Sequence, residues 1–548
     1  MHLNKHTHPL LVLMFYFACS GLCFARIQDS TTSKIIESSI IDSFLLKYKA
    51  SEDTLAILQK DFDSNTRTYV VLPYLINKHC VLSIYTQFLT NAQGECFLGY
   101  LPKDEQHHRL LLHNLTASCS QKQATVTEID SGLQWRIKAA PNSRVRVHYL
   151  IFLDSLTANN QDYYKPFPAL FDKTYFILKG ISLFLAPKEV GSYLEKQTMF
   201  ELHWLKNPNI PQWKYANRFG NTKDIQKFHT SYDVFLNTLY CGGNADTSTK
   251  HPEFKLSNEA VDTTSGISLF TLGVFTDERH SIFIKELQRI IQAERKLWKD
   301  TTPFHYLSCL AGAGFEREQD VIAFAVHDSF FGILSDRITS INGAVKYLLS
   351  HEIMHRWIGP PQIPSESASG FGFCAIEGFT EYFARLVLLQ SHSISEQEYV
   401  QEYNKAIALY HASAQKNAVA DSVNTNFWKD LTIMRIPYYR GDILAHNWNA
   451  EITRHTKGKY TFADAFRSIR STQKRITDIS FAKSLKPYIG RDVMPDILRI
   501  MKKGAMAQPD KNALPFASLE WLTIPSPNDS TITVKAPQYV LRSSLLRH

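Results

Sequence analysis

Two histidines and one glutamate in a single short segment have the types and spacing of a metal-binding site. His351 and His355 are four residues apart in a stretch, residues 342–357, that is predicted to be helical and to end before two prolines. Residues four apart share one face of a helix, so both imidazoles can bind the same Zn²⁺ ion. Glu352 then lies beside the open fourth position of the metal, where a general base can take a proton from water.

A zinc site needs a third protein ligand, and a second predicted helix supplies a candidate carboxylate. Glu377 lies 22 residues after His355, which leaves room for a loop and a returning helix over residues 375–390. Glu381 follows one helical turn later. A carboxylate there can accept a hydrogen bond from the ring nitrogen of a ligand histidine that does not bind the metal, and so fix the orientation of the ring. The pattern predicts one zinc ion held by two imidazoles and one carboxylate.

The residues around these positions resemble a known group of enzymes. The pattern His-Glu-x-x-His-x-Trp at 351–357, followed by Glu-Gly-Phe-Thr-x-Tyr at 377–382, resembles the gluzincin metallopeptidases. Two branches share the pattern, the alanyl-type aminopeptidases and the glycyl aminopeptidase family, and segments 303–306 and 435–441 are most similar to the glycyl family. The resemblance implies an all-β amino-terminal domain, a thermolysin-like catalytic domain, one zinc ion and peptide substrates.

The same resemblance implies roles for residues outside the metal-ligand set. Tyr438 matches the tyrosine whose hydroxyl stabilises the oxyanion, with Tyr439 as the alternative if the register is shifted by one. In these enzymes a glycine-rich strand that ends in glutamate binds the free α-amine of the substrate, and Gly314 and Glu316 occupy that place. The segment departs from the family pattern, because an alanine separates its glycines and an arginine follows where a histidine is usual. Whether cleavage is restricted to the amino terminus is therefore left open.

Hydrophobic periodicity indicates a multidomain protein with a β-rich part and a helical part. Short runs separated by turns predict an all-β amino-terminal domain over residues 26–205. Residues 206–458 change to long helical periods around strands predicted at 304–310 and 321–326, which indicates the thermolysin-like α+β catalytic domain. Residues 459–548 are expected to form a helical carboxy-terminal region with an irregular tail.

The first 25 residues have the pattern of a signal peptide. His2 and Lys5 precede an apolar run over residues 10–18, and small residues lead to a cleavage site after Ala25. The apolar run is too short to span a bilayer, and no later segment reaches the roughly 18 apolar residues of a membrane helix. We therefore expect an exported protein, periplasmic or secreted, with no stable membrane insertion after the signal is removed.

Composition is that of a globular protein without a nucleic-acid partner. Hydrophobic residues make up 44% and charged residues 20% of the chain, which excludes a disordered chain and one with many membrane spans. The formal net charge of +8 is spread along the sequence without a run of like charges, so no nucleic-acid binding is predicted. In an exported protein disulfides can form, and Cys80 with Cys96 is the expected pair.

Three functions remain open at this point. The first is a zinc metallopeptidase, in particular an aminopeptidase acting on peptides with a free amino terminus. The second is a gluzincin endopeptidase or another hydrolase on the same fold. The third is a catalytically inactive gluzincin-fold binding protein. Every ligand and base position holds a competent residue, which favours an enzyme. The oligomeric state does not follow from the sequence.

Overall fold

The structure, a computed structural model, divides by its contacts into two compact units, which are described one at a time. The first unit contains residues 1–163, 167–280 and 304–338, and the second contains residues 164–166, 281–303 and 339–548. The residues that the structure describes are 65–76, 79–99, 112–119, 122–129, 134–152, 170–171, 175–192, 194–220, 224–244, 254–273, 275–313, 321–335, 337–338, 341–365, 367–527 and 529–542.

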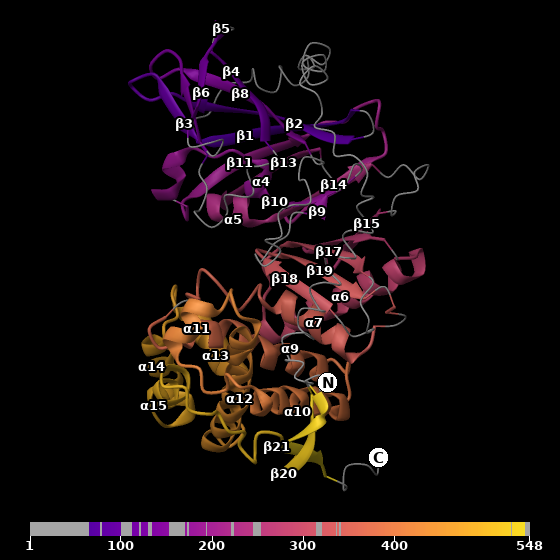
Figure 1. The fold of residues 1–548 in the computed structure, drawn as a ribbon, viewed down its shortest axis with the longest axis vertical. Helices are drawn as coiled ribbons and strands as arrows, with labels where there is room; N and C mark the ends of the chain where they lie inside the picture. Colours follow the sequence, from indigo (N-terminus) through magenta and orange to yellow (C-terminus); the bar gives the residue numbers. More distant parts are fainter. Residues whose placement is uncertain are drawn as a thin grey trace, which may run out of the picture. The chain divides into compact units, whose positions relative to one another are not determined.

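A seven-stranded sheet is the largest sheet of the first unit. Its strands are β1 (Thr66–Ile76), β2 (His79–Leu89), β4 (Leu112–Cys119), β5 (Lys122–Gln123), β8 (Arg144–Phe152), β11 (Gln197–Trp204) and β13 (Ile225–Ser231). They lie in the order β13, β11, β1, β2, β8, β4, β5, and β1 and β11 run parallel (Figure 1). Along β8 the buried residues Val145, Val147 and Tyr149 alternate with half-buried ones, as expected for a strand with one face on the core.

Two smaller sheets complete the β-rich part of the first unit. One has the order β12, β14, β10, β9 and the other the order β3, β7, β6. The elements are β3 (Glu95–Leu98), β6 (Thr125–Ile129), β7 (Gln134–Lys138), β9 (Leu170–Phe171), β10 (Tyr175–Lys179), α4 (Gly180–Leu183), η2 (Lys188–Ser192), β12 (Trp213–Asn217), α5 (Tyr232–Asn237) and β14 (Leu239–Asn244). Buried tyrosines in this core have partners: the hydroxyls of Tyr69 and Tyr149 donate to the carbonyls of Leu185 and Leu183, at 2.7 Å and 2.8 Å.

The first unit also contains a mixed five-stranded sheet. Its strands are β15 (Phe254–Ala260), β16 (Gly266–Leu272), β17 (His305–Ala313), β18 (Val321–Val326) and β19 (Ser329–Ser335). The order is β15, β16, β17, β19, β18, and β17 runs parallel to both of its neighbours. Parallel neighbours require crossover connections, and the helix α6 (Asp277–Trp298) joins β16 to β17. The strands predicted at 304–310 and 321–326 are confirmed as β17 and β18.

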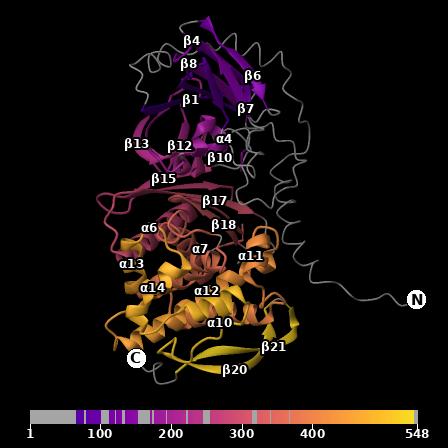
Figure 2. The same cartoon turned by 90° about the vertical axis from the view of Figure 1, so that its left-hand side faces the viewer.

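The second unit is mainly helical (Figure 2). Its elements are α7 (Gly343–Met354), α8 (Phe371–Phe373), η3 (Cys374–Gly378), α9 (Phe379–Gln390), α10 (Glu396–Ala412), α11 (Ala420–Asn426), α12 (Leu431–His455), α13 (Phe462–Thr472), α14 (Asp478–Ile489), α15 (Met494–Asp496), η4 (Ile497–Lys502), β20 (Ala517–Ser526) and β21 (Asp529–Leu541). With the β-rich amino-terminal region and the mixed α/β middle, this helical region confirms the predicted multidomain fold class.

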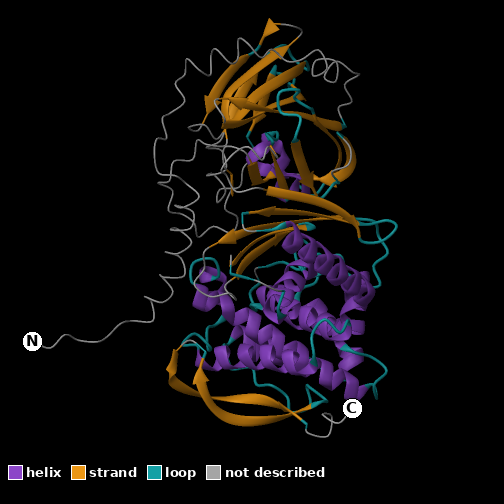
Figure 3. Ribbon diagram, turned by 90° about the vertical axis from the view of Figure 1, so that its right-hand side faces the viewer, coloured by secondary structure: helices purple, strands orange, loops and turns teal. Residues whose placement is uncertain are grey.

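The end of the chain corrects one expectation. Residues 459–548 were predicted to end in an irregular tail, but β20 and β21 form an antiparallel hairpin (Figure 3). Both strands carry β-branched residues, which favour extended backbone. The hairpin is fixed to α10, because the Asn404 side chain donates to the carbonyl of Tyr539 at 2.8 Å and accepts from its amide at 2.7 Å.

The expected Cys80–Cys96 disulfide is wrong, because the thiol of Cys96 is free and buried. Cys80 belongs to β2 of the large sheet, and Cys96 belongs to β3 of the three-stranded sheet. Burial raises the pKa of the Cys96 thiol to about 12, which keeps it protonated. Among the described residues, no helix is both long and apolar enough to cross a membrane.

Candidate metal centre

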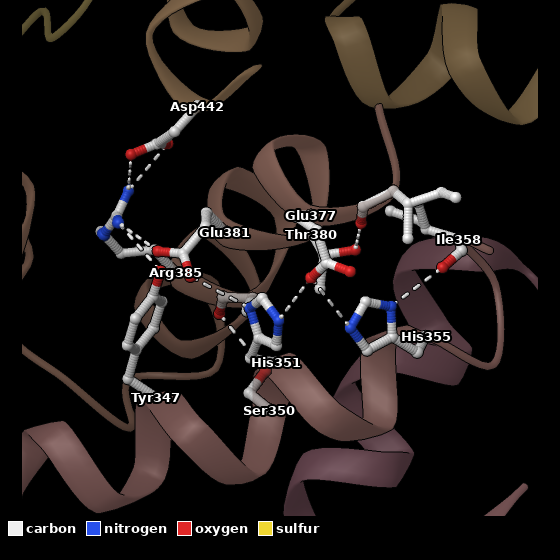
Figure 4. A network of polar contacts seen from close by, with 12 residues as sticks. Tyr347, Ser350, His351, His355, Ile358, Glu377, Thr380, Glu381, Arg385 and Asp442 are labelled. Carbon is white, nitrogen blue, oxygen red and sulfur yellow. Dashed lines mark hydrogen bonds and ion pairs between the residues drawn. The ribbon is translucent and has the colours of Figure 1, made fainter. Parts of the chain in front are cut away.

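Three side chains converge on one point in the second unit. The Nε2 atoms of His351 and His355 lie 3.5 Å and 3.6 Å from the same carboxylate oxygen, Oε2 of Glu377 (Figure 4). One donor atom from each residue lies within 4.8 Å of the others. The sequence predicted this trio from three positions, and the structure brings all three together.

The helix α7 carries His351, is followed directly by His355 as its carboxy-terminal cap, and is fixed at each end. It begins with Asn342, whose side chain accepts a hydrogen bond from the amide of Val345 at 3.1 Å. Ser350 donates to the buried carboxyl of Glu294 at 2.7 Å. At the other end the indole of Trp298 lies 3.1 Å from the sulfur of Met354. The residues of α6 therefore fix the axis and the rotation of α7, and with them the direction of the two imidazoles.

Glu377 projects from a short π-helical turn rather than from the regular α-helix that the sequence predicted. Residues 374–378 form η3, and α9 continues from Phe379. A π turn adds one residue to a helical turn and shifts the side chains on its face, and such turns are common at functional sites. The hydroxyl of Thr380 donates to the carbonyl of Ile376 at 2.5 Å, which satisfies a carbonyl inside this turn.

A pair of glycines lets η3 approach α12. A Cβ atom built on Gly378 would lie 2.4 Å from the Cα of Gly441, and one built on Gly441 would lie 2.1 Å from the carbonyl oxygen of Cys374. Real Cβ atoms do not come so close, so the two backbones can touch only because both residues are glycine. This contact brings Tyr438, one turn before Gly441, next to Glu377.

The second nitrogen of each histidine has a partner that orients the ring. Nδ1 of His351 lies 3.2 Å from Oε1 of Glu381, and Nδ1 of His355 lies 3.1 Å from the carbonyl oxygen of Ile358. The carbonyl of Ile358 accepts a hydrogen bond from Nδ1 of His355, whereas the Glu381 carboxylate lies within ion-pair distance of Nδ1 of His351 without hydrogen-bond geometry. Both oxygens favour a proton on Nδ1 and a free lone pair on Nε2. Both lone pairs then face the Glu377 carboxylate.

A buried ionic network continues from Glu381. Nη2 of Arg385 lies 3.6 Å from Oε2 of Glu381 and donates to the hydroxyl of Tyr347 at 3.1 Å. Nη1 of Arg385 donates to both carboxylate oxygens of Asp442, at 3.1 Å and 3.2 Å. Asp442 also lies 3.1 Å from Nδ1 of His446. Arg385 and Asp442 are each 1% exposed, so this ion pair is almost free of solvent screening.

Burial and neighbouring charges set the ionisation of the site. Burial lowers the pKa of His351 to about 4, so its imidazole is neutral, which is the form that binds a metal. Burial alone would raise the pKa of Glu377, but His355 and His351 lower it below its usual range. Burial, and then the charge of Glu377, raise the pKa of Glu352 well above its usual range. The pKa values of the two carboxyl groups are thus shifted in opposite directions.

Of the two tyrosines considered for the oxyanion, Tyr438 is the one at the trio. Its ring stacks against the His351 ring, with 5.8 Å between centroids and an interplanar angle of 9°, and its hydroxyl interacts with the Glu377 carboxylate. Tyr439 instead lies 6.0 Å from the ring of Tyr410. Burial raises the pKa of Tyr438 well above 10, so its hydroxyl keeps its proton.

Two predicted residues cannot be placed, and one buried ion pair was not predicted. Gly314 and Glu316, the candidate amine-binding residues, lie outside the described residues. Sequence reasoning missed Arg385 and its partner Asp442, which are 57 positions apart. The one available signal was the spacing of Glu381 and Arg385, four residues apart on one helix face.

The trio fits a zinc ion by its chemistry. Oε2 of Glu377 is buried and has no hydrogen-bond partner among the described residues, although it faces two imidazole nitrogens. A buried polar atom without a partner is costly unless something else satisfies it, and a cation between the three donors would do so. Two imidazole nitrogens and one carboxylate oxygen, with an open fourth position, are a donor set of catalytic zinc sites.

One family model matches the segment that holds these residues. Residues 345–444 match the family model of the M61 glycyl aminopeptidases. The fold is similar to that of an aminopeptidase N family protein of Idiomarina loihiensis, with a TM-score of 0.64 and 17% identity over 84% of this chain and 80% of that chain. An M1 zinc metallopeptidase of Deinococcus radiodurans bound to Tyr-Ser-Ala gives a TM-score of 0.49 and 11% identity, over 82% of this chain and 97% of that chain. A search of curated protein sequences gave no significant match.

The matched segment contains the complete trio. His351, His355 and Glu377 all lie within residues 345–444, as do Glu352 and Tyr438. The part of the chain that matches the M61 glycyl aminopeptidase model is therefore the part that holds the candidate metal centre.

Proposed function

We propose that the protein is a zinc-dependent aminopeptidase that hydrolyses the first peptide bond of peptides with a free amino terminus. The observation that carries the proposal is the convergence of His351, His355 and Glu377 on one point, with a buried Glu377 oxygen that no described hydrogen-bond donor satisfies. The match to the M61 glycyl aminopeptidases supports the reaction class.

In this proposal the imidazoles of His351 and His355 and the carboxylate of Glu377 hold the zinc ion. When bound there, zinc supplies a Lewis acid that lowers the pKa of water and polarises the scissile carbonyl. Glu381 and the carbonyl of Ile358 keep the two imidazoles in the tautomer that leaves Nε2 free. One zinc ion per chain is the expected stoichiometry.

Glu352 carries the proton in the proposed reaction. Its carboxylate takes a proton from the attacking water as the oxygen–carbon bond forms, and gives it to the amine nitrogen as the carbon–nitrogen bond breaks. The raised pKa of Glu352 suits this task, because a carboxyl group that holds a proton readily can serve as base and then as acid. General acid–base groups of this kind contribute about 10²- to 10⁴-fold to a rate.

Tyr438 stabilises the negative charge that develops on the carbonyl oxygen. Its hydroxyl is beside Glu377 and remains protonated, so it can donate a hydrogen bond to that oxygen. Glu316 is the proposed partner of the substrate's α-ammonium group, on the family resemblance alone. An enzyme without this pairing would act as an endopeptidase.

The test is peptide hydrolysis by the purified protein with its metal content measured in parallel. We expect cleavage of Ala-Ala-Ala-amide, no cleavage of its acetylated form, and about one zinc ion per chain. The variant Glu352→Gln should lose about 10²- to 10⁴-fold in rate while keeping its zinc. Cleavage of acetylated peptides at internal bonds would favour the endopeptidase, and a zinc-loaded protein without turnover would favour the binding protein.

We also propose that the protein is exported, on the signal-peptide pattern of residues 1–25. The mature protein should begin at Arg26. Amino-terminal sequencing of protein recovered outside the cytoplasm checks this, and an intact Met1 on that protein would contradict it.

A further inference from the structure

Arg435 is an exposed cation one side chain away from the metal trio. It lies on α12, and its guanidinium carbon is 5.2 Å from the centre of the Tyr438 ring. Tyr438 in turn stacks on His351. The guanidinium is close enough to the reaction centre for its charge to act on Glu352, Glu377 and His351.

Two other arginines near the site are bound by anionic or carbonyl groups. Arg385 is bound to Asp442, and Arg440 donates to the carbonyls of Ala418 and Lys416 at 2.7 Å and 2.8 Å. Within the described part of the chain, Arg435 makes no hydrogen bond and no ion pair, and its guanidinium lies over the Tyr438 ring. Its five N–H donors are therefore free for a ligand.

Glu377 and Glu381 are close enough to act on the Arg435 charge, but both carboxylates also face other groups. Glu377 faces both histidines, and Glu381 lies between His351 and Arg385. With a divalent cation held by the trio, a second cation nearby is unfavourable unless an anion lies close to both. The anion that a guanidinium binds best in a peptide is a carboxylate, through two parallel N–H···O bonds.

We propose that Arg435 selects substrates that carry a carboxylate within about two residues of the scissile bond, since an extended peptide advances about 3.3 Å per residue. This inference rests on the proposed peptidase function and adds to it the chemical class of the substrate. The carboxylate has three possible sources: the side chain of the first residue, the side chain of the second residue, or the free carboxy terminus of a dipeptide.

The experiment measures binding in a chain that does not turn the peptide over. Dissociation constants are measured by calorimetry for Glu352→Gln and for the double variant Glu352→Gln/Arg435→Gln, with zinc content checked in each. Three peptide pairs separate the sources: Glu-Ala-amide with Gln-Ala-amide, Ala-Glu-amide with Ala-Gln-amide, and Ala-Ala with Ala-Ala-amide. Within each pair only one carboxylate is replaced by an amide.

We expect one pair to bind with a preference of about 10- to 100-fold for the carboxylate, as for a hydrogen bond to a charged group. Arg435→Gln should reduce that preference to about one, and Arg435→Lys should restore part of it, because it keeps the charge and loses the planar fork. A general effect on folding or zinc loading changes both members of a pair and cancels in the ratio. Arg454→Gln removes an exposed charge near the far end of α12 and should leave the ratio unchanged.

Two results would overturn the inference: no carboxylate preference in any pair, or a preference that survives Arg435→Gln. The proposed function is tested separately by turnover of the chain with Glu352 intact. A protein that cleaves neutral peptides without a carboxylate preference would keep the function and lose the inference. A protein that prefers carboxylates in binding and cleaves no peptide would contradict the proposed function and support the role of Arg435.

Discussion

Oε1 of Glu381 lies 3.2 Å from Nδ1 of His351, whereas Nε2 of the same ring faces Glu377. The imidazole is thus held from both sides, by one carboxylate that orients it and another that shares its proposed metal. Glu381 is not one of the three converging donor residues, so its effect on a metal must pass through His351.

Removing the Glu381 carboxylate should weaken zinc binding without removing a ligand. For Glu381→Ala we expect the zinc dissociation constant to rise about 10- to 100-fold, because His351 loses the acceptor that orients it. Glu381→Gln keeps an acceptor oxygen and should lose less. Competition with a chelator of known affinity measures both, and equal zinc affinity in Glu381→Ala and the unmodified chain would contradict the orienting role.

The ion pair between Arg385 and Asp442 should matter for stability. Arg385→Met leaves Asp442 buried without its main counter-charge, and breaking a buried pair in this way costs about 3–5 kcal/mol. The double variant Arg385→Met/Asp442→Leu should recover much of that loss, because no lone charge is left. Urea unfolding of the single and double variants measures both changes. If Arg385→Met lowers the free energy of unfolding by less than about 1 kcal/mol, the network is dispensable for stability.

The glycine contact between η3 and α12 predicts a coupled loss of stability and zinc affinity. Gly441→Ala forces a Cβ atom toward the Cys374 carbonyl, so the two segments must separate and Glu377 must move. We expect a loss of about 1–3 kcal/mol, the usual cost of overpacking, together with weaker zinc binding. Gly343→Ala is the matched control, because its nearest atom is a flexible Glu398 oxygen at 3.6 Å. If Gly441→Ala behaves like this control, the close approach is not required.

Histidines of the first unit predict acid sensitivity. Burial is the main cause that lowers the pKa values of His148, His280 and His305, each to about 4. The unfolded chain has histidine pKa values near 6.5, so it binds more protons than the folded chain between about pH 6.5 and 4. Stability from these groups is fully present above pH 6.5 and falls as the pH drops through that window.

One variant isolates this contribution from the carboxyl groups that also titrate in acid. His148→Gln removes a titrating group and can keep a polar contact to Ser83, whose hydroxyl lies 2.8 Å from Nε2 of His148. The free energy of unfolding of this variant should fall less steeply between pH 6.5 and 4.5 than that of the unmodified chain. Parallel slopes would mean that His148 is not held neutral in the fold.

The metal trio was predictable from sequence because most of its geometry is local. The spacing of His351 and His355 fixes a common helix face, and the Asn342 cap and the following prolines bound the helix. Glu377 was identified on a second predicted helix. Its π-helical backbone was not predicted, because a one-residue insertion in a helical turn leaves no clear mark in hydrophobic periodicity.

Contacts between distant segments were beyond sequence reasoning. The pairing of Arg385 with Asp442 depends on how α9 packs on α12, and no local pattern encodes it. The start of α12 at Leu431 is hard to place from sequence, because Pro437 lies inside the helix, where a proline usually ends or kinks one. Asp430 was the available signal, because its side chain accepts from the amide of Thr432 at 2.8 Å and caps the helix.

Zinc content per folded chain is the most direct test of the account. Metal analysis of the purified protein, with X-ray absorption at the zinc edge, should give one zinc ion with nitrogen and oxygen ligands and no sulfur. His351→Ala, His355→Ala and Glu377→Ala should each fold and lose most of that zinc. A folded, unmodified chain that binds no zinc, or a Glu377→Ala chain that binds it as tightly as the unmodified one, would contradict the claim that these three residues form a metal centre.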